Sequence, residues 1–202
     1  MALQLLSTSA DLDLSPRGLT FDGKFFYLAD DTNDLIKKYD LNFKLIRQSA
    51  ALGFSPTGLA FDGKYLYICG DITTRIYKFD LNFKLIRTSE PLGYTPYGIA
   101  FNGKYLYLID GSFNRFRQYD LNFNLIRTSP NMFFGATCNA FDGAFMYVQD
   151  DENNLLKKYD LNFNLKRTSG DLGYIPWGIA VDGKYIYMCD NDWLTVKKYY
   201  WY

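Results

Sequence analysis

The chain has 202 residues, of which 48% are hydrophobic and 19% aromatic, and its 22 Lys and Arg residues balance 22 Asp and Glu residues. This composition excludes an intrinsically disordered chain and fits one domain with a sizeable core. Zero formal net charge provides no basic field for nucleic acid, and no apolar run is long enough to span a bilayer. We therefore expect neither nucleic-acid binding nor membrane insertion.

The first segment, Met1–Pro16, has neither a basic start nor a continuous apolar stretch, so it predicts no signal peptide and assigns no compartment. Its residues Gln4–Ser9 match Lys84–Ser89, which close a repeat unit farther along the chain. We expect about residues 3–9 to form a β-strand that precedes the first complete unit.

A 40-residue repeat then runs through the sequence. An Asp-Gly pair, or Asn-Gly in one copy, starts at positions 22, 62, 102, 142 and 182, and Asp-Leu-Asn-Phe starts at 40, 80, 120 and 160. A tyrosine also recurs at 27, 67, 107, 147 and 187. A constant period of this length is typical of repeat architectures.

One unit predicts four short strands, at 58–61, 65–69, 75–79 and 84–88, which we name the inner, second, third and outer strands. Asp62-Gly63 suits a two-residue hairpin turn, and Asp80-Leu81-Asn82 suits another tight turn. No helical periodicity competes with this pattern. Four strands per unit at this period indicate a blade of a β-propeller.

The fifth unit has inner, second and third strands, through Lys198, and then stops at Tyr202. The N-terminal strand can supply its missing outer strand. The sequence therefore predicts one all-β domain over residues 1–202: a five-bladed β-propeller with four antiparallel strands per blade. A clasp of three C-terminal strands and one N-terminal strand closes its ring.

The repeat also resembles a known family. Its segments 63–68, 75–82 and 84–87 (Gly-Lys-Tyr-Leu-Tyr-Ile, Arg-Ile-Tyr-Lys-Phe-Asp-Leu-Asn and Lys-Leu-Ile-Arg) resemble NHL-like propeller repeats. NHL-like rings generally have six blades. The five predicted here are similar in number to tachylectin-type propellers, which bind amino sugars, and to five-bladed glycosidases and fructosidases. Because the superfamily includes lectins, hydrolases, receptors and scaffolds, the resemblance implies a fold and leaves the function open.

Variation among the five copies is concentrated in two kinds of loop, which we expect on one face of the ring. Blade-connecting loops join an outer strand to the next inner strand, at 10–17, 50–57, 90–97, 130–137 and 170–177. Apical loops join the second strand to the third, at 30–34, 70–74, 110–114, 150–154 and 190–194. Variable loops on a rigid scaffold indicate a binding face, although relaxed drift of exposed loops would produce the same pattern.

The position before each inner strand should surround the mouth of the central channel. It is occupied by Arg17, Thr57, Tyr97, Thr137 and Trp177, a set that suits a polar ligand with a flat apolar side, such as a sugar. A channel plug is the alternative. The same loops contribute three further aromatic candidates for ligand contact, Tyr94, Tyr174 and Trp193.

The fourth unit departs from the others. Cys138 replaces a glycine, and Asn139 stands where the other units have Leu or Ile. Because a buried amide needs partners, Asn139 is a candidate to reach a ligand, a water molecule or a neighbouring loop. The three cysteines (Cys69, Cys138 and Cys189) predict small core residues and no disulfide framework.

Catalysis has weak support. The sequence has no histidine, and its only glutamates are Glu90 and Glu152, both in the variable loops. The aspartates after the second strands, such as Asp30 and Asp71, fit ordinary turn residues better than a Ca²⁺ site, so we expect no metal and no cofactor.

Three functional hypotheses remain. The first is a non-enzymatic module that binds a sugar or a protein through the variable face. The second is a structural subunit, natural or engineered, that is monomeric or stacks on itself. The third, a glycosidase-like enzyme, is remote because the inner strands carry no carboxylates.

Overall fold

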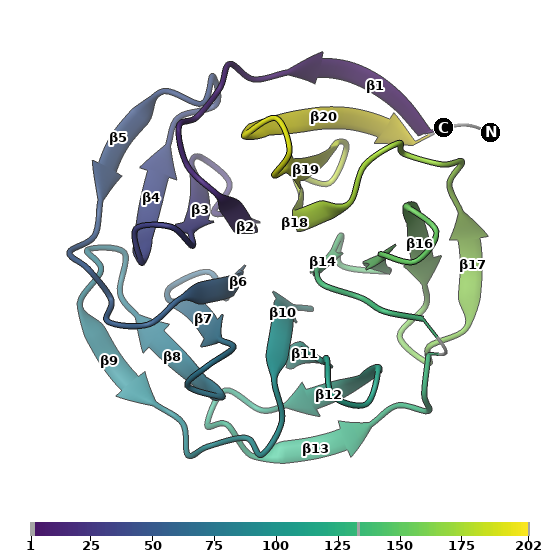
Figure 1. Ribbon diagram of the computed structural model, residues 1–202. Coiled ribbons are helices and arrows are strands. Elements are labelled where there is room, and N and C mark those ends of the chain that lie inside the picture. The colour runs from purple at the N-terminus through teal and green to yellow at the C-terminus, as the bar shows by residue number, and fades with distance from the viewer. Residues whose placement is uncertain (1–2, 133, 202) are drawn as a thin grey trace.

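The computed structural model describes residues 3–132 and 134–201, and it is a ring of five four-stranded antiparallel sheets (Figure 1). Each sheet is one blade, with its inner strand next to the central axis and its outer strand at the rim. The five-bladed propeller and its closing clasp are therefore confirmed. No helix that could cross a membrane occurs in the described part of the chain.

The strands of the first two blades follow the repeat. The first blade contains β2 (Pro16–Phe21), β3 (Phe26–Asp30), β4 (Leu35–Tyr39) and β5 (Leu45–Gln48). The second contains β6 (Pro56–Phe61), β7 (Leu66–Gly70), β8 (Arg75–Phe79) and β9 (Leu85–Thr88).

The remaining blades repeat this order, with a shortened inner strand in the fourth. The third blade contains β10 (Pro96–Phe101), β11 (Leu106–Asp110), β12 (Arg115–Tyr119) and β13 (Leu125–Thr128). The fourth contains β14 (Asn139–Phe141), β15 (Met146–Asp150), β16 (Leu155–Tyr159) and β17 (Leu165–Thr168). The fifth contains β18 (Pro176–Val181), β19 (Ile186–Asp190), β20 (Thr195–Trp201) and the N-terminal β1 (Leu3–Thr8).

Neighbouring inner strands approach each other closely around the axis. A Cβ atom on Gly58 would lie 2.7 Å from the amide nitrogen of Ile99 and 2.9 Å from the carbonyl oxygen of Tyr97, both in the next blade. A Cβ on Gly178 would meet the carbonyl oxygen of Arg17 at 2.6 Å. At four of the five positions of this column the glycine hydrogen leaves space for the neighbouring backbone, and Cys138 occupies the fifth.

The core lies between blades rather than inside one sheet. Tyr67, Cys69 and Ile76 of the second blade pack against Ile99 and Leu106 of the third, and all five side chains are at most 1% exposed. Burying an aliphatic side chain of this size contributes about 1.5–3 kcal/mol. Each blade is consequently stabilised by its two neighbours, which favours a closed ring.

The Asp-Gly turns differ from the two-residue turn that the sequence predicts. In the second blade only Gly63 has a positive φ, at 96°, and the loop closes with a hydrogen bond from Asp62 N to the carbonyl oxygen of Tyr65, at 3.1 Å. The Asp62 carboxylate accepts hydrogen bonds from the amides of Lys64 and Tyr65 at 2.8 and 2.7 Å and from the Tyr67 hydroxyl at 2.8 Å. The aspartate side chain thus replaces backbone bonds that a tighter turn would make.

The outer strands have two features that oppose pairing with other chains. The outer strands β5, β9, β13 and β17 each pair with the third strand of their blade through a register shift. Opposite β5, this shift falls between Lys38 and Tyr39. Arg47 donates to the side-chain and backbone oxygens of Asn82 in the next blade, at 3.2 Å each, and lies over the Phe83 ring. Bulges and charges of this kind protect sheet edges from aggregation.

The clasp pairs β1 with β20 along its length, from Leu3 opposite Trp201 to Thr8 opposite Lys197. Ser9 extends it, because its amide donates to the carbonyl oxygen of Val196 and its hydroxyl accepts from the Val196 amide, both at 2.9 Å. The two ends of the described chain consequently lie side by side at one blade (Figure 1).

Removing residues 1–9 should lower the melting temperature of the ring by roughly 10 °C, because the third strand of the fifth blade loses its partner. Circular dichroism during a thermal scan measures this change. A synthetic peptide of residues 1–10 should restore much of the loss, whereas a scrambled peptide should not. A truncated protein that melts at the native temperature would contradict the proposed stabilising role of the clasp.

Candidate functional site

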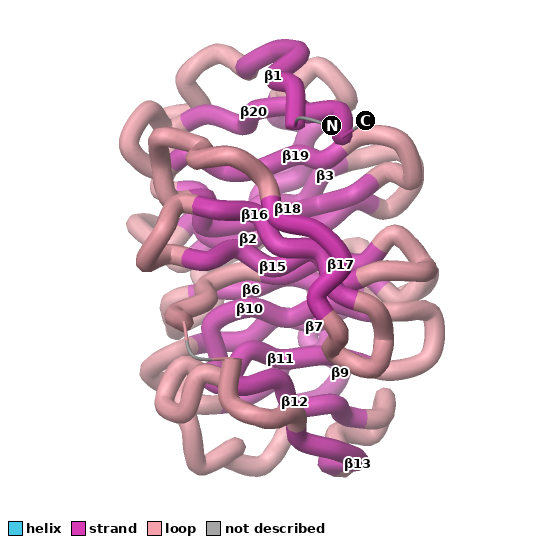
Figure 2. Tube along the Cα trace, turned by 90° about the vertical axis from the view of Figure 1, so that its right-hand side faces the viewer, coloured by secondary structure: helices cyan, strands magenta, loops and turns pink. Residues whose placement is uncertain are grey.

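The ring has two different faces, visible from the side in Figure 2 as loops on either side of the strands. The blade-connecting and apical loops lie on one face, which we call the variable face. The turns between inner and second strands and between third and outer strands lie on the other, which we call the uniform face. The candidate site is on the variable face, where the five copies differ.

Beneath the apical loops, a buried ion pair recurs in four blades. The last residue of the second strand is an aspartate with 0% exposure, and its carboxylate lies 2.6–2.8 Å from a cationic nitrogen of the third strand. The pairs are Asp30–Lys37, Asp110–Arg117, Asp150–Lys157 and Asp190–Lys197. These aspartates also accept apical-loop amides, as Asp150 does from Glu152 and Asn153, so they hold the loops in place.

The second blade lacks both members of this pair. Gly70 and Tyr77 occupy the two positions, and the Tyr77 ring stacks on Phe54 with centroids 4.0 Å apart and planes 11° apart. In the fourth blade, the corresponding Phe134 has the Lys157 ammonium 3.7 Å from its ring centroid. In the second blade, stacking of Tyr77 on Phe54 thus replaces the contact between a cation and an aromatic ring that the fourth blade has. The buried carboxylate is absent there together with the cation that would neutralise it.

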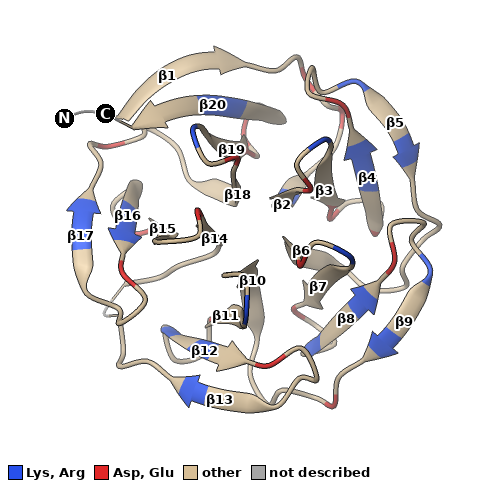
Figure 3. Ribbon diagram, turned by 180° about the vertical axis from the view of Figure 1, so that it is seen from behind, with Lys and Arg blue, Asp and Glu red and all other residues tan. Residues whose placement is uncertain are grey.

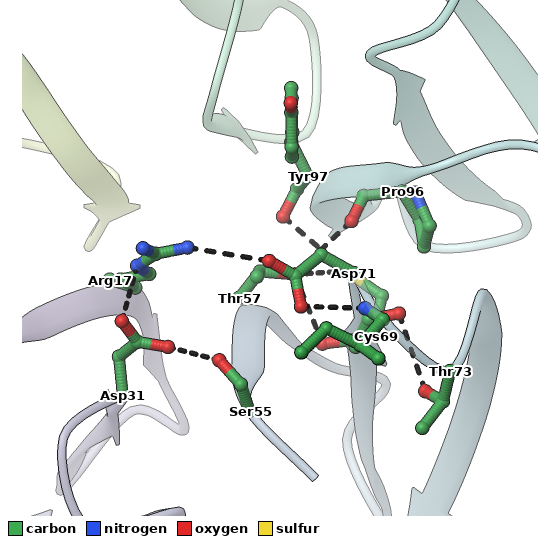
Figure 4. A network of polar contacts seen from close by, with 11 residues as sticks. Arg17, Asp31, Ser55, Thr57, Cys69, Asp71, Thr73, Pro96 and Tyr97 are labelled. Atoms are coloured by element: carbon green, nitrogen blue, oxygen red, sulfur yellow. Dashed lines mark hydrogen bonds and ion pairs between the residues drawn. The ribbon is translucent and has the colours of Figure 1, made fainter.

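The mouth of the channel contains a charged network centred on Arg17 (Figure 4). Its Nε lies 2.9 Å from Asp31 of the same blade, and its Nη1 lies 3.6 Å from Asp71 of the next blade. Asp31 also accepts a hydrogen bond from the Ser55 hydroxyl. Sequence reasoning missed this network because it treated the loop aspartates as separate turn residues. The available signal was that Arg17 is the one cation in these loops.

Two aromatic candidates accompany Arg17 at the mouth. The Arg17 guanidinium carbon lies 5.0 Å from the centroid of Trp177, which is half-buried. Tyr97 is also half-buried, and its ring covers Gly111, where a Cβ atom would come within 2.3 Å of the ring. The structure therefore brings Arg17 and Trp177 together and keeps Tyr97 in place against the adjacent apical loop.

The two threonine candidates face the neighbouring blades. Thr57 and Thr137 are 5% and 8% exposed. The Thr57 hydroxyl lies 3.2 Å from the carbonyl oxygen of Pro96 in the third blade. The Thr137 hydroxyl donates to Gln149 Oε1 of its own blade at 2.8 Å and lies 3.3 Å from the carbonyl oxygen of Pro176 in the fifth blade. Both hydroxyls are engaged at the boundary with the next blade, and ligand contact by either threonine stays a prediction.

The three other aromatic candidates divide by exposure. Tyr94 and Tyr174 are 4% and 5% exposed, and each shares a 3.1 Å hydroxyl contact with a tyrosine of its own blade, Tyr119 or Tyr199. Trp193, by contrast, is 73% exposed at the tip of an apical loop. Ligand contact by any of the three stays a prediction, with Trp193 the most accessible.

The fourth blade is unusual in its structure as well as in its sequence. Asn139 is 4% exposed, and its Nδ2 donates to the carbonyl oxygen of Tyr107 at 3.0 Å, whereas its Oδ1 has no partner among the described residues. Burial, followed by repulsion from Glu152 and Asp150, raises the pKa of the Asp151 carboxyl above its usual value. Asp151 also has no Lys or Arg ion-pair partner in the described part of the chain, unlike Asp31 and Asp71.

The channel itself is narrow near the mouth and wider at the uniform face. A cavity of about 90 Å³ is lined by all five inner strands, from Leu19 to Phe21 in the first blade and around Asn139 in the fourth. It has room for a few water molecules. Within the described residues, no three carboxylate or thiol side chains converge as metal ligands would.

Comparison with known proteins supports the fold and leaves the function open. No family model matches the chain, and no curated protein sequence matches it. Among solved structures, the Myxococcus xanthus glutaminyl cyclase is similar with a TM-score of 0.86 and 13% identity, covering 98% of this chain and 95% of that one. A chain of a nidogen/laminin complex has a TM-score of 0.67 and 20% identity, with 87% and 72% covered.

A third similar structure is virginiamycin B lyase from Staphylococcus aureus, with a TM-score of 0.60 and 15% identity over 94% of this chain and 67% of that one. At these identities the likeness shows the fold alone. The propeller fold is thus shared with two enzymes and with a chain of a protein complex, and these likenesses assign no function.

Replacing Lys157 by Tyr should destabilise the protein by about 3–5 kcal/mol, because the Asp150 carboxylate stays buried without its partner. The double variant Asp150→Gly and Lys157→Tyr reproduces the second blade, including an aromatic ring above Phe134, and should recover most of this loss. Urea unfolding of the two single variants and the double variant measures the coupling. Additive effects would show that the two positions are independent.

The three cysteines should not react with a thiol reagent at pH 8 while the protein is folded. All three are buried and free. Burial raises the pKa of Cys69 to about 11 and raises the pKa values of Cys138 and Cys189 as well, so the reactive thiolate is scarce. Absorbance with Ellman's reagent should report three thiols only after guanidinium is added. A thiol that reacts in the native protein would contradict this burial.

Proposed function

We propose that this chain is a non-enzymatic binding module that holds a carbohydrate at the mouth of the channel on the variable face. The observation that carries the proposal is the pairing of Trp177 with Arg17 beside the carboxylates of Asp31 and Asp71. A sugar ring has an apolar C–H face and a rim of hydroxyl groups. An aromatic plane next to closely placed donors and acceptors matches both.

The rigidity of this group supports binding. Arg17 contacts Trp177 in the fifth blade, Asp31 in its own blade and Asp71 in the second blade, so three blades hold one cluster. Side chains that are already oriented lose little conformational entropy when a ligand arrives. Asp151, which has no Lys or Arg ion-pair partner among the described residues, lies on another part of the same face and offers a further acceptor for a ligand hydroxyl.

The same geometry gives little support to a glycosidase. Such an enzyme needs two carboxyl groups separated by the scissile bond, one acting as an acid. Here the Arg17 guanidinium lies between Asp31 and Asp71 and pairs with both. Asp151 and Glu152 are neighbours on one loop rather than a pair across the channel.

The test is a glycan array followed by calorimetry on any glycan that binds. Trp177→Ala should weaken binding about tenfold or more, which equals roughly 1.4 kcal/mol, because the stacking surface is lost. Phe113→Ala is the matched control, since Phe113 is an exposed aromatic on the same face outside the cluster. Trp193→Ala separates binding at the mouth from binding at the loop tip.

The proposal fails if no glycan binds at any concentration tested, or if Trp177→Ala binds as tightly as the native protein. Loss of binding in Trp193→Ala together with native binding in Trp177→Ala would move the site to the apical loop of the fifth blade.

A further inference from the structure

Although the net charge of the chain is zero, acidic and basic side chains are distributed unequally between the two sides of the ring. We assign each Asp, Glu, Lys and Arg to the variable side or the uniform side of the ring, which are the sides that carry the variable face and the uniform face. The assignment follows the loop that contains the residue or, for a residue within a strand, the groups that its side chain contacts. Fourteen acidic and seven basic side chains then belong to the variable side, which gives that side a net charge of −7. The acids are Asp11, Asp13, Asp30, Asp31, Asp34, Asp71, Glu90, Asp110, Asp150, Asp151, Glu152, Asp171, Asp190 and Asp192. The bases are Arg17, Lys37, Arg75, Arg115, Arg117, Lys157 and Lys197.

The uniform side has the opposite balance. It carries eight acidic side chains and fifteen basic ones, for a net charge of +7. Figure 3 shows Lys and Arg on the turns that join β2 to β3, β6 to β7 and β18 to β19, and on the outer strands. The acids are Asp22, Asp40, Asp62, Asp80, Asp120, Asp142, Asp160 and Asp182. The bases are Lys24, Lys38, Lys44, Arg47, Lys64, Lys78, Lys84, Arg87, Lys104, Arg127, Lys158, Lys166, Arg167, Lys184 and Lys198.

The acids of the uniform side are largely engaged within the chain. Asp22 accepts bonds from the amides of its own turn and from the Tyr27 hydroxyl, and Asp40 accepts from the amides of Asn42 and Lys44. The lysines at the tips of these turns are exposed instead, and the ammonium of Lys24 lies 5.1 Å from the centroid of the Phe25 ring. The outward charge of the uniform side is therefore basic.

Each side also exposes apolar groups among its charges. On the variable side, Ile72, Phe113 and Trp193 are 83%, 53% and 73% exposed at the tips of apical loops. On the uniform side, Leu41 and Leu161 are 60% and 38% exposed in the turns before the outer strands. Exposed apolar side chains within a charged surface are a feature of protein interaction sites.

We propose that a second copy of this chain docks head to tail, with the variable side of one ring against the uniform side of the next. The two sides carry equal and opposite charge, so this arrangement is attractive, whereas contact between two like sides is repulsive. Because charges recur with the blades, several rotations of one ring on the other bring acids near lysines. The apolar tips would be covered in the same contact.

The ring is large enough for such a contact. Specific interfaces bury about 800 Å² per partner, which is less than one-tenth of the 9047 Å² surface of the protein. A head-to-tail contact leaves one variable and one uniform side open, so it extends into a column rather than closing as a dimer. Only the ring at one end of a column would have an open mouth, so a ligand there would compete with growth. Docking of a second copy does not require a carbohydrate site at the mouth.

Sedimentation velocity at low and high ionic strength is the first test. At about 20 mM salt the mean mass should rise with protein concentration above the 23.4 kDa of one chain, and at about 500 mM salt it should return to that value. The reason is that salt screens attraction between exposed charges. A mass of one chain at every concentration and salt level would overturn the proposal.

Charge-reversal variants then test which sides meet. The first variant combines Lys24→Glu, Lys64→Glu and Lys104→Glu, which reduces the uniform side from +7 to +1. The second combines Glu90→Lys, Glu152→Lys and Asp192→Lys, which reduces the variable side from −7 to −1. All six side chains are exposed. Each variant alone should stay a single ring, and an equimolar mixture should form a one-to-one complex that does not grow further.

A variant that carries all six substitutions is the control for net charge. It has the native net charge of zero but no complementary sides, so it should remain a single ring at low salt. Native-like association of this variant would overturn the proposal. The proposal would also be overturned if the native protein stayed a single ring and bound heparin through its lysines. That result would show that the uniform side binds an anionic polymer rather than a second copy of the chain. Circular dichroism confirms that each variant is folded.

Discussion

The close approach of neighbouring inner strands is the constraint on which the rest of the ring depends. At Gly58 and Gly178 the backbone of the next blade lies where a side chain would begin. This contact draws the blades together, so that a second strand can pack on both neighbours: β7 buries Leu66 against the first blade and Tyr67 against the third. The fourth blade shows what happens without the glycine. Its Cys138 directs the thiol toward the carbonyl oxygen of Pro176, at 3.2 Å, and its inner strand begins only at Asn139.

Because packing constrains the inner part of every blade, sequence differences are tolerated mainly in the loops that connect the strands. The buried ion pairs hold four apical loops by their first residues while the tips differ freely, from Asn33 to Trp193. On the other face, the aspartate of the turn accepts bonds from backbone amides, and it does so equally from the amides of Lys24 and of Ala144, so the lysine side chain takes no part in the turn. The acids beneath the apical loops are therefore part of the fold, whereas the lysines at the opposite turns lie beside a turn that forms without them in other copies.

Much of the fold could be predicted because the repeat period, the turn residues and the matching ends are local features of the sequence. The Asp62-Gly63 turn was predicted in the right place but with the wrong geometry, since the pair alone does not show that the aspartate side chain will bond the amides of Lys64 and Tyr65. The candidate site was predicted less completely. Positions 17, 57, 97, 137 and 177 are equivalent in the repeat, yet the structure buries Thr57 and Thr137 and joins Arg17 to Asp31 and Asp71. Contacts of this kind form between residues at different positions of the repeat. Aligning the repeats compares residues at the same position, so it does not show which residues at different positions are in contact.

Because of the clasp, the first strand of the chain belongs to the last blade of the ring. Since β1 fills the place that β5, β9, β13 and β17 fill in the other blades, the break in the backbone falls at one of five equivalent turns. The ends lie together at that turn (Figure 1). A circular permutant that begins at any other turn before an outer strand should therefore build the same ring. Such a permutant would keep the ring, its two faces and their charges unchanged.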